Sequence, residues 1–402
     1  MSFKQIQYQV SLFCQMLIAR TGRWHRFFGF ISDHVPILVL GPLALVSKYD
    51  DVCTVFSDST HFAVPYAKSI EETTGPFILA MGDTPKYHKL TAILQAAIHR
   101  GDECFIHDHI DQWSRDELDQ GHELDVVRLA RVNGARLIEH YFGVTDCGSM
   151  AQWIRDIFRH IFVNFSKNPA IRAKALDAAN GLNRHIDRLI AEWHDRDPTA
   201  PPATFLERIL TNNAPTSEIT DEVVRQLVAG TIVGAIEPAA NAIAHVVDYL
   251  LDHEAALEAS RDAVNSDNQS ILKKIVFEAL RFYPQNPFLL RRCVRSTVVA
   301  PYTPRAKRIP LGAIVVALTS SASFDREQFI QPRIFRVDRN LDNYLHYGSG
   351  MHKCIGRHLA DVIVPATISA IVSRKGLRRA FWPRGRMRFD GSFVGKLIVR
   401  YD

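Results

Sequence analysis

One of the six cysteines lies in surroundings that could do chemistry. The segment Tyr347-Gly-Ser-Gly-Met-His-Lys-Cys354-Ile-Gly356 places Cys354 between a glycine-rich turn and an apolar helical run. Gly348 and Gly350 can adopt positive φ and let the backbone approach a flat ligand, and Gly356 removes a side chain where a helix would pack against that ligand. A helix N-terminus lowers the pKa of a thiol, and the thiolate is the form that binds metal. A single cysteine is more often simply buried, so the spacing around Cys354 must decide.

That spacing is specific. The pattern aromatic-Gly-x-Gly-x-His-x-Cys-x-Gly, from Tyr347 to Gly356, resembles the haem-binding loop of the cytochrome P450 family, whose first position is usually Phe. The resemblance implies that Cys354 is the axial ligand of a haem b (iron protoporphyrin IX), and that His352 hydrogen-bonds a haem propionate. It also implies that Tyr347, Gly348, Gly350 and Gly356 lie against the cofactor. Thiolate ligation favours cleavage of an O–O bond.

A charged pair upstream fits the same family. Glu278 and Arg281 are three apart, so they share one face of a predicted helix and can pair. Such pairs usually lie at the solvent-exposed surface and contribute little to stability. Their position before Phe282-Tyr-Pro284, however, resembles the Glu-x-x-Arg pair of the family, and Phe335-Arg-Val-Asp-Arg339 resembles the loop that supplies its third member, Arg339.

Two further segments resemble places where the family binds the haem propionates. Pro287–Cys293 offers Arg291, with Arg292 as the alternative, and a guanidinium matches a carboxylate because its donors form a fixed fork. The second segment, Gly82–Lys89, departs from the family pattern, because the usual His aligns with Tyr87 and the usual Arg with Thr91. Tyr87, His88 or Lys89 could substitute.

The central helix departs more seriously. Leu227–Asn241 resembles the oxygen-activation helix, and the family's Ala-Gly-x-Asp/Glu-Thr motif reads Gly234-Ala-Ile-Glu-Pro238 here. The acid is kept as Glu237, but Pro238 stands where the family has threonine. In the family that hydroxyl is thought to hold the water that delivers protons during O–O cleavage. Proline has no N–H, so the carbonyl of Gly234 loses its helical partner, and we expect the helix to open or kink there. The freed carbonyl could hold a water.

Three functional hypotheses follow. The first is a monooxygenase that uses O2 and electrons from a separate redox partner, with Glu237 and water in the kink as the proton relay. The second is a peroxide-driven peroxygenase or a hydroperoxide-rearranging haem enzyme, which needs no such relay. The third and remotest is a non-catalytic haem sensor. We favour the monooxygenase.

The resemblance also suggests pocket walls and partners. The predicted pocket is apolar and favours a small hydrophobic substrate, although each residue taken singly is more often core. Opposite charges steer protein encounters, so Lys89, Arg100, Lys353 and Arg357 could dock a ferredoxin, supplied by its ferredoxin reductase, or a flavin redox partner. The candidate pocket residues are Phe77, Leu79, Phe162, Ile232, Ile236, Phe288, Leu289 and Phe393.

The elements that would position this site can be predicted from hydrophobic patterning. Gly41-Pro42 between Ile37–Leu40 and Leu43–Val46 predicts a hairpin. Apolar residues at three- and four-residue spacing predict helices over Leu124–Phe142, Leu176–Trp193 and Ser217–Leu251. Segments typical of strands return at Ile314–Leu318 and Lys396–Arg400. Between them lies a long loop, Ser320–Met351, that we expect to be functional.

We therefore predict one domain over residues 1–402, mostly α with small β-sheets. Early segments at Val46–Val52 and Phe56–Asp58, and Tyr141–Val144, also resemble the family, so the likeness runs almost end to end. It implies the P450 fold, a helix-rich triangular body with the haem between the long central helix and the cysteine loop.

Composition bears on the expected partners and cellular location of the protein. The net charge of +5 is small for 402 residues and no run of five or six like charges occurs, so nucleic acid is not an expected partner. The cysteines are too scattered for a disulfide framework or structural zinc. The N-terminal segment does not resemble a signal peptide, and no early apolar stretch is long enough to span a bilayer. We expect a cytoplasmic monomer without membrane insertion.

Overall fold

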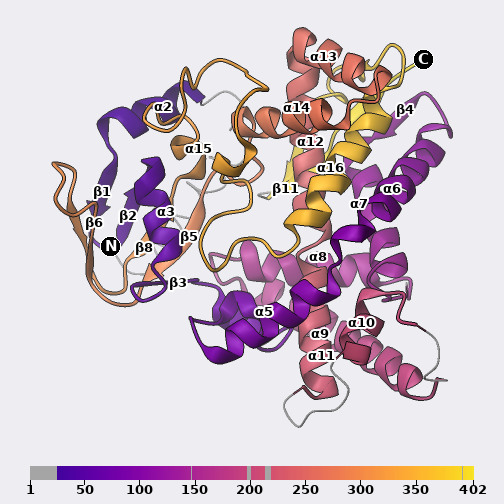
Figure 1. Cartoon of the computed structure of the whole chain (residues 1–402), viewed down its shortest axis with the longest axis horizontal. Helices are drawn as coiled ribbons and strands as arrows, with labels where there is room; N and C mark the ends of the chain where they lie inside the picture. The colour runs from indigo at the N-terminus through magenta and orange to yellow at the C-terminus, as the bar shows by residue number, and fades with distance from the viewer. Residues whose placement is uncertain (1–24, 146, 197–200, 213–218, 392) are drawn as a thin grey trace.

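A computed structural model describes residues 25–145, 147–196, 201–212, 219–391 and 393–402. Residues 1–24, on which the signal-peptide expectation rests, lie outside the described residues. Figure 1 shows a large helical part beside a smaller part rich in strands. The helices are α2 (His25–His34), α3 (Tyr49–Ser57), α4 (Ala67–Glu71), α5 (Pro85–Ala97), α6 (Glu103–Leu118), α7 (Val126–His140), α8 (Met150–Phe162), α9 (Pro169–His194), α10 (Phe205–Asn212), α11 (Asp221–Val233), α12 (Ile236–Asp252), α13 (Glu254–Asn265), α14 (Gln269–Phe282), α15 (Thr319–Ala322) and α16 (Arg357–Val372), with 3-10 turns at Ile78–Ala80, Arg100–Asp102 and Leu341–Asn343.

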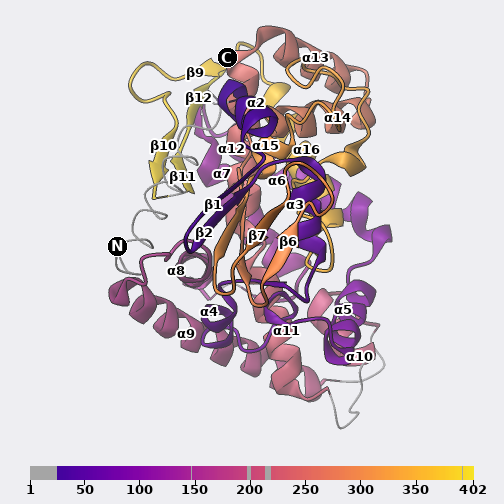
Figure 2. The ribbon, with the colours of Figure 1, turned by 90° about the vertical axis from the view of Figure 1, so that its left-hand side faces the viewer.

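The strands form four small sheets. The largest has the order β1-β2-β8-β5-β3, and Figure 2 shows it in front of the helices. The strands are β1 (Ile37–Leu40), β2 (Leu43–Val46), β3 (Phe62–Ala63), β4 (Glu123–Asp125), β5 (Leu289–Cys293), β6 (Thr297–Val299), β7 (Lys307–Ile309), β8 (Ile314–Ala317), β9 (Arg378–Arg379), β10 (Arg388–Asp390), β11 (Phe393–Lys396) and β12 (Ile398–Arg400).

The predicted hairpin is confirmed. Strands β1 and β2 pair antiparallel, with Ile37 opposite Val46, and Gly41 supplies the positive φ of the turn at 56°. Strand β8 then pairs parallel to β2 and antiparallel to β5, so the sheet carries β5 and its arginines toward the helical part.

One helix prediction needs correction at its start. The pattern from Leu124 predicts helix, but Glu123–Asp125 forms β4, because it pairs with β12 and its last residue caps α7 by accepting from the Val127 N–H. Within the predicted helix Ser217–Leu251 the chain forms α11 and α12, with the expected opening between them. Ser217 lies outside the described residues.

The helix pair α11–α12 runs through the middle of the helical part, beside α16 (Figure 1). Its span Asp221–Asp252 is long and apolar enough to cross a bilayer by composition, yet 72% of its most apolar window is buried inside the protein. This burial is typical of a core helix.

Three charged residues fix the long loop that leads to Cys354. Arg281 donates to Glu278 through Nε at 2.9 Å and through its second guanidinium nitrogen at 2.7 Å, and both side chains are completely buried. Arg339 Nε approaches Glu278 at 3.4 Å, and the backbone N–H of Arg336 donates to the same carboxylate at 3.0 Å. The sequence-predicted trio is thus brought together, and it ties α14 to the loop.

Candidate functional site

The loop of Cys354 is held by its own backbone. The N–H of Cys354 donates to the carbonyl of Tyr347 at 3.0 Å, and the N–H of Arg357, the first residue of α16, donates to the carbonyl of Cys354 at 3.3 Å. Gly348 and Gly350 adopt positive φ of 68° and 73°. A Cβ on Gly350 would lie 2.7 Å from the carbonyl oxygen of Phe56, so only glycine lets the loop lie this close to α3.

The ring of Tyr347 is held behind the cysteine. Its hydroxyl donates to Asp361 of α16 at 2.7 Å, and Lys273 of α14 forms an ion pair with the same carboxylate at 2.9 Å. Burial raises the pKa of Tyr347 well above its ordinary value, so the hydroxyl stays a donor. The hydroxyl that distinguishes Tyr347 from the family's usual Phe therefore has a hydrogen-bond partner in this fold, Asp361.

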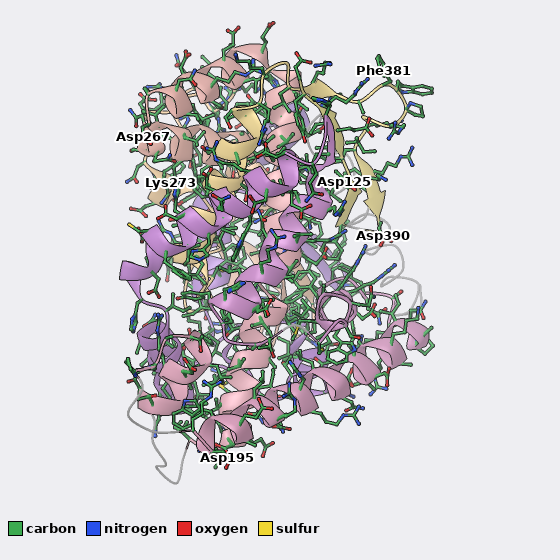
Figure 3. All side chains as sticks on the ribbon, turned by 90° about the vertical axis from the view of Figure 1, so that its right-hand side faces the viewer. Asp125, Asp195, Asp267, Lys273, Phe381 and Asp390 are labelled. Atoms are coloured by element: carbon green, nitrogen blue, oxygen red, sulfur yellow. The ribbon has the colours of Figure 1, made fainter. Side chains whose placement is uncertain are left out.

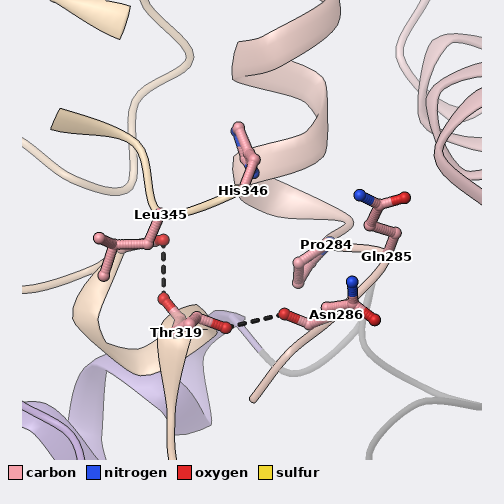
Figure 4. A pocket seen from close by; sticks show the side chains of 7 residues that line it. Pro284, Gln285, Asn286, Thr319, Leu345 and His346 are labelled. Carbon is pink, nitrogen blue, oxygen red and sulfur yellow. Dashed lines mark hydrogen bonds between the residues drawn. The ribbon is translucent and has the colours of Figure 1, made fainter. Parts of the chain in front are cut away.

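A small cavity lies under the segment that precedes this loop (Figure 4). The hydroxyl of Thr319 donates to the carbonyl of Asn286 at 2.7 Å, and the Nε2 of His346 hydrogen-bonds the carbonyl of Phe277 at 2.9 Å. The cavity has a volume of about 10 Å³, room for about one water molecule. It is too small for a substrate.

Gly234 and Cys354 are both accessible, whereas Ile236 and Leu359 are buried. The hydrophobic cluster that contains Ile236 also contains Leu359, and Ile355 of the cysteine loop packs against it. One hydrophobic cluster therefore connects the cysteine loop with the start of α12.

Burial and a backbone donor act in opposite directions on the Cys354 thiol. The backbone N–H of Gly356 lowers the pKa of the thiol, as expected at the start of a helix. Burial is the larger effect and raises the pKa above its ordinary value.

Three hydrogen-bond donors, Arg291, Tyr66 and His352, lie beside one another at the cysteine loop. Arg291 on β5 is 4% exposed, while Arg292 is exposed, because alternate residues of a strand point to opposite faces. The strand geometry thus selects Arg291 from the two candidates. Arg291 hydrogen-bonds Tyr66, and its charge helps to keep His352 neutral: burial first, and Arg291 second, lower the pKa of His352 to about 4.

Of the three predicted substitutes on α5, Tyr87 joins this group. Its ring lies edge-on to His352 with centroids 5.9 Å apart, and its hydroxyl donates to the carbonyl of Met351. His88 instead is exposed and pairs with Asp83 at 2.6 Å. The structure therefore does not bring His88 together with the other predicted cofactor residues.

The central helix opens where Pro238 predicts it. The N–H groups of Gly234 and Ala235 donate to residues only three positions back, Thr231 at 3.2 Å and Ile232 at 3.1 Å, so the helix tightens and then restarts at Ile236. The lost bond to the Gly234 carbonyl is the physical reason, as expected.

Glu237 is not a free carboxylate. Arg131 of α7 holds both of its oxygens, at 2.9 Å each, and Glu237 is 2% exposed. The sequence gives no sign of this pair, because 106 residues separate its members. Tyr66 and Asp361 were missed for the same reason: their partners are distant in sequence and no motif marks them.

The predicted pocket residues separate into two groups. Phe162 of α8 lies 5.1 Å from the ring of Tyr66, and Phe158 links it to Phe393 of β11 at 5.2 Å. Phe77 lies against the central helix, where a Cβ on Gly230 would be 2.3 Å from its ring. Leu79 packs against the hydrophobic cluster that contains Phe77. Leu289 lies 3.5 Å from the position that a Cβ on Gly348 would take.

The second group has contacts typical of core. Ile236 packs against Gly134 of α7, where an added Cβ would lie 3.1 Å from it. Ile232 is fully buried, and Phe288 belongs to a different hydrophobic cluster. For these three residues a role in a pocket stays a prediction.

The residues fit the haem that the resemblance implies. Cys354 offers one free, accessible sulfur, and glycines at positive φ shape the loop that holds it. Arg291, His352 and Tyr66 converge beside it as donors suited to carboxylates.

Comparisons with known proteins support the family resemblance. A sequence model of the family described as "Cytochrome P450" matches residues 149–374, more than half of the chain. Among relatives, a linoleate diol synthase of Gaeumannomyces graminis is 32% identical over 84 residues, 21% of this chain and 7% of that protein. The cytochrome P-450 monooxygenase DoxA of Streptomyces sp. (strain C5) is 32% identical over 135 residues, 34% of this chain and 31% of that protein. The matched stretches thus span well under half of both relatives.

The solved structures show the same fold. The crystal structure of CalO2 aligns with a TM-score of 0.79 and 20% identity, covering 94% of this chain and 97% of that one. At this identity the likeness establishes the fold alone. The predicted mostly α fold with small sheets is confirmed.

Proposed function

The chain belongs to the cytochrome P450 family of haem-thiolate oxidoreductases, and on that premise we propose that it is a monooxygenase acting on a small hydrophobic substrate. The observation that supports this most is the accessible Cys354, held by the backbone bonds of a glycine-containing loop at the start of α16. A thiolate-bound haem supplies oxygen activation, because sulfur donates electron density that favours O–O cleavage.

We assign the cofactor contacts as follows. Cys354 supplies the sulfur ligand of a haem b, and Arg291, His352 and Tyr66 hold its propionates. Tyr347 keeps the cysteine loop against α16 through Asp361. Phe77, Leu79, Phe162, Leu289 and Phe393 form an apolar surface that excludes water and orients the substrate by shape.

Electrons come from a separate redox protein in this proposal. Lys353, beside the cysteine, is exposed and suits an acidic partner such as a ferredoxin or a flavin protein. Arg357 also lies at this face but is paired with Asp342 at 2.8 Å, so it offers less free charge. The side chain of Arg100 lies outside the described residues.

Two observations favour a peroxide-driven reaction as a second candidate. Pro238 lacks the hydroxyl of the proton relay, and Glu237 can pass a proton only after it releases one of its bonds to Arg131. In addition, one relative is a linoleate diol synthase, so linoleic acid belongs among the substrates to be tested.

The deciding experiment supplies one oxidant at a time. The haem-loaded protein is incubated with hydrophobic compounds, linoleic acid included, and with a ferredoxin, its reductase and NADPH, with hydrogen peroxide, or with a fatty-acid hydroperoxide alone. Product in the first arm supports the monooxygenase, and product only in the peroxide arms contradicts it. No turnover in any arm, with CO or NO causing a structural response, would support the sensor.

Cys354→Ala is the control for all arms. It removes the sulfur ligand and should abolish both the product and the thiolate signature of the reduced CO complex. If that signature survives, the assignment of Cys354 as ligand is wrong.

A further inference from the structure

Positive charge is concentrated at the C-terminal end of the chain. Residues 374–402 contain nine Lys or Arg and two Asp, whereas the whole chain has a net charge of only +5. The cationic residues in this segment are Arg374, Lys375, Arg378, Arg379, Arg384, Arg386, Arg388, Lys396 and Arg400.

Two large aromatic side chains are exposed in the middle of this segment. Phe381 is 77% and Trp382 84% exposed, in the loop between β9 and β10. Figure 3 shows Phe381 on a loop that projects from the edge of the molecule. Exposing two adjacent rings of this size costs solvation free energy, so they mark an interaction site.

The loop is built to present these rings. The N–H of Arg384 donates to the carbonyl of Phe381 at 2.9 Å, and the N–H of Ala380 donates to Ile398 of β12 at 3.1 Å. A Cβ on Gly385 would lie 2.2 Å from the carbonyl oxygen of Ala380, so the loop closes tightly on itself. The rings are thus held outward by an ordered turn.

Some of the cationic side chains around the rings form ion pairs within the protein, and others do not. Arg384 pairs with Glu123, Arg379 with Asp248 and Asp252, and Arg378 with Asp402. Arg386 and Arg388 are exposed and have no acidic partner among the described residues. Two cations are therefore free to meet an outside anion beside the rings.

We propose that this loop, residues 380–388, docks the protein on the surface of an anionic lipid membrane. Aromatic rings partition into the interface between headgroups and acyl chains, and adjacent Arg residues bind anionic headgroups. A projecting tip can bury itself in a bilayer. Single-stranded nucleic acid, by contrast, is bound along a positively charged groove.

The docking loop is continuous with the candidate site. It leads into β10, which forms a hairpin with β11, and Phe393 of β11 lies at the aromatic cluster with Phe158. A hydrophobic substrate dissolved in the membrane would then be close to the pocket side of the protein. The docking itself does not depend on the proposed reaction.

Co-sedimentation with vesicles tests the proposal. The full chain should bind vesicles of phosphatidylcholine mixed with phosphatidylglycerol, should bind phosphatidylcholine alone much more weakly, and should be released by salt. The double variant Phe381→Ser/Trp382→Ser and the double variant Arg386→Gln/Arg388→Gln should each weaken binding roughly tenfold.

Matched controls remove equally exposed residues elsewhere. Leu311→Ser removes a side chain that is 69% exposed on the strand-rich part, and Arg295→Gln/Arg308→Gln removes two exposed cations there, so neither should change binding. Equal binding to neutral vesicles, no binding to either, or full binding by the aromatic variant would each overturn the proposal. Binding to an acidic protein that needs the arginines but not the rings would do the same.

Discussion

At the scale of single residues, Glu278 shows how strongly the site depends on buried charge. It accepts hydrogen bonds from Arg281, from the backbone of Arg336 and from Tyr344, and it is completely buried. Burying two charges costs several kcal/mol, which their mutual bonds offset only while both are present. Each partner therefore depends on the other.

Glu278→Ala should destabilise the protein by about 3–5 kcal/mol, because it leaves Arg281 buried and unpaired. Urea unfolding monitored by circular dichroism measures the change. The matched control is Arg115→Ala, which breaks the solvent-exposed pair with Asp111 and should cost less than about 1 kcal/mol. Equal effects of the two substitutions would show that the buried pair does not hold the loop.

At the scale of elements, the break between α11 and α12 joins backbone geometry to the reaction. Pro238 affects the site in two ways, since it lacks both an N–H and a hydroxyl. Pro238→Ala restores only the N–H, whereas Pro238→Thr restores both.

If the missing hydroxyl limits proton delivery, Pro238→Thr should raise the product formed per electron consumed, and Pro238→Ala should not. NADPH consumption and product are measured together with the redox partner. In both variants the new amide of residue 238 should be protected from hydrogen exchange, because its N–H can bond the Gly234 carbonyl. Equal coupling in all three proteins would place residue 238 outside the proton path.

These elements also show what sequence can predict. The hairpin around Gly41, the helical periods and the break at Pro238 follow from local rules, and the structure contains all three. The Cys354 motif is equally local. By contrast, the first residues of the Leu124 helix are a strand because of a partner near the C-terminus, and Glu237 is tied to a residue 106 positions away. Contacts of that kind leave no periodic or motif signal.

At the scale of the whole molecule, buried histidine side chains should make the stability of the fold depend on pH. His245 in α12 is 4% exposed beside the ring of Phe389, and burial lowers its pKa to about 4. Burial likewise lowers the pKa of His346 to about 4, partly opposed by its bond to the carbonyl of Phe277. Both stay neutral in the folded protein at pH values where free imidazole is protonated.

The sign of the pH dependence follows from this difference. Below an unfolded pKa of about 6.5 the unfolded chain binds protons that the folded chain refuses, so stability should fall as the pH drops from 6.5 to 4 and then level off. Each histidine can contribute up to about 3 kcal/mol. Urea midpoints measured across this range should show a shallower slope for His245→Phe than for the parent, whereas His122→Gln, at an exposed position, should leave the slope unchanged. If the parent protein is equally stable at pH 7 and pH 4.5, the prediction is wrong. Both imidazoles would then be protonated in the folded protein without a loss of stability.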